Sequence, residues 1–147
     1  MKHIILGAAL ALATAVPSFA SDTAAPDGAE LYIINLEDGA SVASPVLVKF
    51  GLRGMGVAPA GVEKDHTGHH HIYLNRPPFG EAEGDAEIAA NGIPSDDNHI
   101  HFGGGQTEVS LDLDPGEHTI QLVLGDHFHV PHSPPVVSDR ITITVTE

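Results

Sequence analysis

The chain has 147 residues, with 20 acidic and 6 basic side chains, so its formal net charge is −14 when histidine is neutral. Such an acidic surface repels nucleic acid and anionic lipid, which argues against a nucleic-acid partner, and it attracts cations. The sequence contains no cysteine, which excludes disulfide bonds and a lipid anchor attached to a cysteine.

The first 20 residues have the three parts of a secretory signal peptide. Lys2 and His3 make a basic start, residues 4–16 are almost purely apolar, and Ser18 and Ala20 are small residues where a signal peptidase cuts. The apolar run is shorter than the roughly 20 residues of a membrane helix, so we predict cleavage after Ala20 and no membrane insertion afterwards. The remaining 127 of the 147 residues, with a charge of −15 once Lys2 is lost, are expected to be periplasmic or secreted.

The mature chain begins with a flexible lead-in, residues 21–28, which is small, polar and proline-containing. A single domain is expected from residue 29 to residue 147. Its sequence contains short runs in which apolar and polar residues alternate, and such a period of two predicts half-buried strands. The expected strands, in chain order, are residues 30–36, 45–52, 69–75, a segment ending at 102, and residues 108–113, 118–124 and 141–145.

About seven short strands in a chain of this size predict an all-β fold, an antiparallel immunoglobulin-like β-sandwich. A β-barrel is the competing architecture. Asp114-Pro115-Gly116 is typical of a turn between two strands. Residues 77–97 form an acidic insertion without a pattern of core residues, which predicts a mobile surface loop; only residues 81–90 offer room for a turn of helix.

Ten of the eleven histidines follow the predicted signal peptide, and nearly all of them lie in three short clusters. Each cluster contains two histidines separated by one residue. Because successive side chains of a strand point to opposite faces, each such pair is expected on one side with apolar neighbours on the other. His70, for example, shares its side with Ile72 and Leu74. The clusters are His66, His69, His70 and His71; His99 and His101; and His127, His129 and His132.

The order of the expected strands brings these clusters together. In an immunoglobulin-type sandwich the connections after the second, fourth and sixth strands lie at one end. The first cluster lies between the second and third strands, the second cluster ends the fourth strand, and the third cluster follows the sixth. We therefore expect all three clusters at one end, whereas His118 begins its strand at the opposite end and is structural.

Convergent neutral imidazoles indicate a metal site, since imidazole is the commonest protein ligand of zinc, copper and nickel. After the signal peptide the chain has one methionine, Met55, and no thiol, so the soft ligands that select Cu(I) are missing. We therefore predict a copper(II) or zinc ion. The candidate ligands are His69, His71, His99, His101, His127, His129 and His132, with Asp65, Asp97 and Asp126 as candidates to orient their ring N–H groups.

Long mixed motifs also carry a resemblance to a known family. They are Thr67-Gly68-His69-His70-His71, the segment from Ile93-Pro94 through His99-x-His101-Phe102 to Gly105-Gln106-Thr107-Glu108, Pro115-Gly116-x-His118-Thr119, and Leu124-Gly125-Asp126-x-x-His129-x-Pro131-His132. Over roughly residues 39–145 the chain resembles domain-of-unknown-function family 4399. The resemblance implies an exported bacterial protein with a small β domain, and it implies no reaction.

Two other function classes remain open. The first is an interaction module that docks a partner of the cell envelope, in which the histidines and aspartates form a structural hydrogen-bond network without metal. The second is a copper-dependent redox enzyme, because a sandwich with His-x-His strands is similar in outline to copper–zinc superoxide dismutase, and Arg140 could guide an anion. The ligand spacing of that family is not matched, and the negative charge works against attracting superoxide, so catalysis is the less favoured reading.

Overall fold

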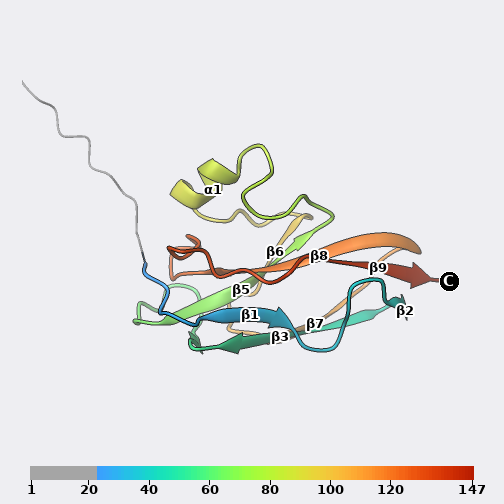
Figure 1. Ribbon diagram of the computed structural model, residues 1–147, viewed down its shortest axis with the longest axis horizontal. Coiled ribbons are helices and arrows are strands. Elements are labelled where there is room, and N and C mark those ends of the chain that lie inside the picture. Colours follow the sequence, from blue (N-terminus) through green and yellow to red (C-terminus); the bar gives the residue numbers. More distant parts are fainter. Residues whose placement is uncertain (1–22) are drawn as a thin grey trace, which may run out of the picture.

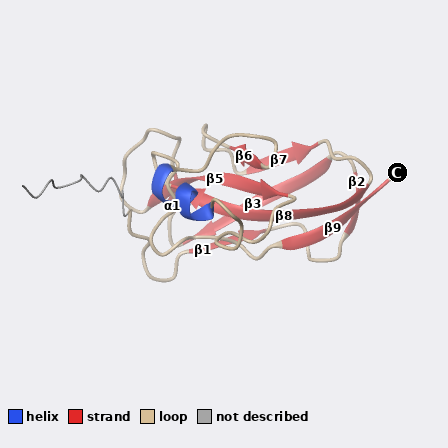
Figure 2. Cartoon of the chain, turned by 90° about the horizontal axis from the view of Figure 1, so that it is seen from above, coloured by secondary structure: helices blue, strands red, loops and turns tan. Residues whose placement is uncertain are grey.

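A computed structural model of the protein describes residues 23–147. The predicted signal peptide lies outside these residues. Two β-sheets face each other, and a short helix, α1, lies on the far side of one of them (Figures 1 and 2). The elements are β1 Glu30–Ile33, β2 Ser41–Ala43, β3 Val46–Arg53, β4 Gly56–Val57, β5 Thr67–Leu74, α1 Asp85–Asn91, β6 His99–His101, β7 Glu108–Leu111, β8 Gly116–Gly125 and β9 Ile141–Thr146.

The two sheets divide the strands unequally. The smaller sheet has the order β1-β3-β7, and all its pairs are antiparallel. The larger sheet has the order β2-β9-β8-β5-β4, with β6 also paired to β5. Its central pairs are antiparallel, whereas β2 runs parallel to β9 and β4 parallel to β5. The predicted all-β sandwich of mainly antiparallel strands is therefore confirmed.

All seven predicted strands are present, and two more were missed. These are β2 and β4, which have only three and two residues and so show no alternation that a sequence could reveal. The strand that ends at residue 101, β6, pairs with β5 in the larger sheet and not with β7. Because β6 runs antiparallel to β5, its last residue still lies toward the end of the sandwich where β5 begins.

The main core lies between the sheets and follows the predicted alternation. From β5, Ile72 and Leu74 point inward with His70, and β8 contributes Ile120, Leu122 and Leu124. The intervening residues of β5 and β8 point to the outer face of the larger sheet, away from β3. The outer face of β5 therefore carries His69, His71 and Tyr73, all of which are buried although they lie outside this core.

The residues between β5 and β6, which we call the insert (residues 75–98), bury this outer face. Ile88 of α1 and Ile93 pack against Tyr73 and Val123 in a second, smaller core. The prediction that residues 77–97 contribute no core residues is therefore wrong. The two isoleucines pack on the outer face of the larger sheet and not between the sheets. The short helix lies where the sequence left room for one. Within residues 23–147, no helix is long and apolar enough to cross a membrane.

Candidate metal centre

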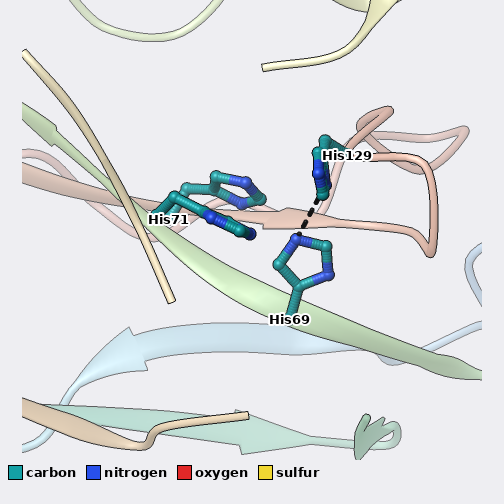
Figure 3. Close-up of side chains that lie close together, drawn as sticks. His69, His71 and His129 are labelled. Atoms are coloured by element: carbon teal, nitrogen blue, oxygen red, sulfur yellow. Dashed lines mark hydrogen bonds between the residues drawn. The ribbon is translucent and has the colours of Figure 1, made fainter. Parts of the chain in front are cut away.

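Four histidines converge on the outer face of the larger sheet. His69 and His71 extend from β5, His101 from β6, and His129 from the loop that follows β8. One ring nitrogen from each lies within 4.8 Å of the corresponding nitrogens of the other three. Figure 3 shows His69, His71 and His129 turned toward one another. We call these residues the four-histidine group.

Strand pairing sets the positions of three of them. His69 and His71 are two residues apart on β5, so their side chains point to the same face. His101 lies directly opposite His71 in the antiparallel pair of β5 and β6. Opposed residues of such a pair have Cβ atoms about 5 Å apart, which brings the two imidazoles side by side. Their ring centroids are 5.2 Å apart and the rings are stacked.

Two glycines leave the space that the rings occupy. Gly125 lies opposite His69 in the pairing of β5 with β8, and a Cβ atom there would lie 2.7 Å from Cε1 of His71. A Cβ atom on Gly103 would lie 2.4 Å from Cε1 of His101. Any larger residue at either position would have to displace an imidazole. In the sequence each glycine lies two residues from a histidine. Only the structure shows that a side chain at either position would collide with an imidazole.

The loop that carries the fourth histidine, which we call the histidine loop (residues 126–132), is organised by Asp126. Its carboxylate Oδ1 accepts hydrogen bonds from the backbone N–H of Phe128, at 2.8 Å, and of Val130, at 3.0 Å. The His129 N–H donates to the Asp126 carbonyl oxygen at 2.9 Å. Asp126 was predicted to orient ring N–H groups; these contacts show it positioning His129 through the backbone.

The ring nitrogens of the group have few hydrogen-bond partners. Nε2 of His69 lies 3.2 Å from Nδ1 of His129, the contact drawn in Figure 3. In contrast, Nδ1 of His69, Nε2 of His71 and Nε2 of His101 are buried without a hydrogen-bond partner. Buried polar atoms are normally paired, and those that are not require an explanation such as a bound ion. A hydrogen-bond network among the histidines does not account for these three atoms.

Burial also keeps the imidazoles of His69, His71 and His129 neutral. It lowers the pKa of His69 from 6.5 to about 4, an effect to which His129 and His101 add and which Asp126 opposes. Burial and the surrounding imidazoles lower the pKa of His71 to about 2. The pKa of His129 is lowered too, by burial and then by His101, against the effect of Asp126. A neutral imidazole offers a lone pair, which is the form that binds a metal.

The structure does not bring the other three candidate ligands into this group. His99 is on the same face as His101 but lies opposite Tyr73, two residues farther along β5 than His71, and its Nδ1 is 2.8 Å from the Asp96 carboxylate. His132 is buried between strands, with ring nitrogens 3.2 Å from the Thr67 carbonyl oxygen and 3.4 Å from that of Leu124.

His127 is half-buried, and its ring packs on that of Phe128, with centroids 4.1 Å apart. It lines a cavity of about 250 Å³ together with Asp65, which is exposed, and Asp126. Asp97 is exposed as well, and its neighbour Asp96 is the residue that contacts a histidine. The sequence signal for Asp96 was its place three residues before His99, where its carboxylate also caps the His99 N–H. Of the seven predicted ligands, the structure thus brings four together, His69, His71, His101 and His129.

Two histidines that were not proposed as ligands, His70 and His118, make other contacts. His70 points into the main core, with its ring 5.0 Å from that of Phe50 and Nδ1 3.1 Å from the Gln106 carbonyl oxygen. His118 lies at the start of β8, at the other end of the sandwich, where Nε2 is 2.8 Å from the Asp114 carbonyl oxygen. Both contacts are structural.

Residues 48–146 match the family described as "Domain of unknown function (DUF4399)". The chain belongs to this family. The matched range contains the whole four-histidine group, so the resemblance drawn from the histidine motifs is confirmed. Neither a curated protein nor a solved structure gives a significant match to the chain.

Proposed function

We propose that this DUF4399 protein is an exported module that binds one Cu(II) or Zn(II) ion through His69, His71, His101 and His129. The observation that carries the proposal is the convergence of four imidazole nitrogens within 4.8 Å of one another, on a buried face where Nε2 of His71 and Nε2 of His101 have no hydrogen-bond partner. Imidazole is the ligand that zinc and copper commonly use, and three or four ligands complete such a site.

The spacing of the nitrogens supports an ion of this size. Metal–nitrogen bonds to zinc are about 2.0–2.1 Å long, so two nitrogens on one ion are at most about 4.2 Å apart. The nitrogens of His69 and His129, at 3.2 Å, already have a spacing typical of neighbouring ligands. Neighbouring nitrogens of a tetrahedral zinc site are about 3.4 Å apart, so the widest separation in the group, up to 4.8 Å, would shorten by about 1.4 Å through side-chain rotation when an ion binds.

The composition supports Cu(II) or Zn(II) over Cu(I). The four-histidine group contains nitrogen ligands alone, and the chain has no cysteine. Cu(I) prefers thiolate and thioether ligands, whereas imidazole suits Cu(II) and Zn(II). The net charge of −14 raises the local concentration of cations around the protein. The predicted signal peptide would place the module in the periplasm or outside the cell, where it would meet ions that have not yet entered the cytoplasm.

Calorimetric titration of the mature chain tests the proposal. The protein is prepared without a histidine tag, stripped with a chelator and titrated with ZnCl₂ and with a weakly chelated Cu(II) salt at pH 7. We expect one ion per chain with a dissociation constant below about 10 μM, or roughly −7 kcal/mol. The His118→Ala variant is the matched control, because it removes an imidazole at the other end of the sandwich, and it should bind as wild type does. Absence of saturable binding would overturn the proposal.

A further inference from the structure

The insert forms a folded cover beside the four-histidine group. In both views α1 lies over the larger sheet, on the side away from β3 (Figures 1 and 2). The buried carboxylate of Asp85 holds the insert together, since it accepts a hydrogen bond from the Gly80 N–H at 2.8 Å and pairs with Nη2 of Arg76 at 3.1 Å. Ile88 and Ile93 then fix the cover to the sheet through the second core.

The C-terminal end of this cover is bonded directly to the backbone of a proposed ligand. The Ile93 N–H donates to the His129 carbonyl oxygen at 2.8 Å. One residue earlier, Gly92 ends α1, and a Cβ atom there would lie 3.0 Å from the Phe128 carbonyl oxygen. The last turn of α1 therefore rests on the histidine loop.

The same end of the insert also leads into a second ligand. Residues 94–98 connect Ile93 to β6, and Asp96 caps the start of β6 by accepting a hydrogen bond from the His99 N–H at 2.9 Å. His101 is two residues farther along this three-residue strand. Two of the four ligands, His101 and His129, thus depend on contacts with the insert. The other two are held in β5, between its strand partners.

The backbone of His129 needs such support. Its φ angle is 68°, in the left-handed region, which residues other than glycine adopt only when their surroundings hold them there. Two hydrogen bonds stabilise this conformation. The His129 N–H donates to the Asp126 carbonyl oxygen, and the Ile93 N–H donates to the His129 carbonyl oxygen. Undocking the insert would remove the hydrogen bond from Ile93 and allow the histidine loop to leave this conformation.

Docking of the insert also has a cost of its own. Nε2 of His99 is buried without a hydrogen-bond partner beside the insert. Water would satisfy this atom if the insert lifted away, and leaving it unpaired is unfavourable. The docked and undocked states are therefore closer in free energy than the buried isoleucines alone would indicate.

We propose that the insert is a metal-sensitive cover: ion binding at the four-histidine group and docking of residues 75–98 stabilise each other. The inference rests on the proposed metal site and adds its regulation. An ion that holds His101 and His129 in place would favour the docked insert, and a docked insert would present these two ligands to the ion. Such coupling is reciprocal. The factor by which docking of the insert strengthens ion binding must equal the factor by which a bound ion favours docking.

Amide hydrogen exchange, followed by mass spectrometry, tests the first half of this reciprocity. We expect amides of residues 85–93 to exchange at least tenfold more slowly when wild-type protein is saturated with Zn(II) than in the metal-free protein. His129→Ala, saturated with Zn(II) through its remaining ligands, should show little of this slowing. Equal exchange rates with and without bound Zn(II) in wild-type protein would overturn the coupling.

Calorimetric titration with Zn(II) tests the second half. Ile88→Ala removes a contact of the cover without touching the four histidines, and we expect it to weaken Zn(II) binding about tenfold. The matched control is Val48→Ala, which removes buried volume from the main core, lowers global stability and should keep the affinity within twofold of wild type. Unchanged Zn(II) affinity in Ile88→Ala would overturn the proposed coupling between the insert and ion binding, and it would leave the proposed metal site standing. Failure of wild-type protein to bind would instead overturn the site itself.

Discussion

The two faces of β5 place the same residue type in two chemical settings. His70 points into the main core, where it packs on Phe50 and contacts the Gln106 carbonyl oxygen. Its neighbours His69 and His71 point the other way and meet two more imidazoles. Three consecutive histidines therefore divide into one structural residue and two candidate ligands. The comparison shows that the face of β5 on which a histidine lies determines whether its imidazole packs in the core or joins the four-histidine group.

The largest expected effect separates the two faces by metal affinity. The double variant His69→Ala/His71→Ala removes half of the proposed ligands, and we expect it to weaken Zn(II) binding about 1000-fold, or roughly 4 kcal/mol. His70→Ala, which changes the residue between them, should leave the affinity within twofold of wild type. Competition titration against a chromogenic chelator measures both. A comparable loss in His70→Ala would mean that the inner face takes part in binding.

This division between the faces could be predicted from the sequence. The alternation in residues 69–75 put His70 with Ile72 and Leu74, and the strand order of a sandwich brought the clusters of His71, His101 and His129 to one end. The first inference rests on the alternation that every strand shares, and the second rests on the strand order of an immunoglobulin-type sandwich. The side chains of residues 69–71 point as the alternation predicted.

The rest of the site could not be predicted, because alternation gives the face of a residue and not its position along the strand. His99 shares its face with His101, yet the register places it beside Tyr73. His132 follows Pro131 in a loop whose path no periodicity describes. The packing of the insert could not be predicted either. Ile88 and Ile93 pack on the outer face of the larger sheet, and the alternation of a half-buried strand predicts that this face is exposed to solvent.

The next effect is a dependence of stability on pH that originates on both faces. Burial lowers the pKa of His70 from 6.5 to about 4, so between these pH values the unfolded chain binds more protons than the folded protein. Stability is therefore full above pH 6.5 and falls as the pH falls toward 4. His70 alone contributes a loss of about 3 kcal/mol, and His69 and His71 add to it in the metal-free protein.

Urea unfolding of chelator-treated protein at pH 7 and at pH 4.5 measures this dependence. The double variant His69→Ala/His71→Ala should retain only the part that His70 causes, so its loss of stability on acidification should be smaller than that of wild type. If the double variant and wild type lose the same free energy of unfolding, the outer imidazoles are not buried as neutral groups.

A smaller effect distinguishes the faces by their contribution to folding. His70→Ala leaves a cavity beside Phe50, and we expect a loss of about 2 kcal/mol in the free energy of unfolding. His71→Ala should cost less than about 1 kcal/mol in the metal-free protein, because it also removes Nε2, a buried nitrogen without a hydrogen-bond partner. Thermal and urea unfolding at pH 7 provide the two values. The reverse order would make His71 the structural residue.

The smallest effect concerns the space around the outer face. In Gly125→Ala the new methyl group would lie 2.7 Å from Cε1 of His71, so the imidazole must turn away from its present position. We expect Zn(II) affinity to fall about tenfold, or roughly 1.4 kcal/mol. Gly61→Ala is a useful control, since a Cβ atom there meets nothing within 4 Å, although its positive φ of 81° adds local strain. It should lower stability slightly and leave affinity unchanged. If Gly125→Ala binds as tightly as wild type, the orientation of His71 over β8 is not what holds the ion.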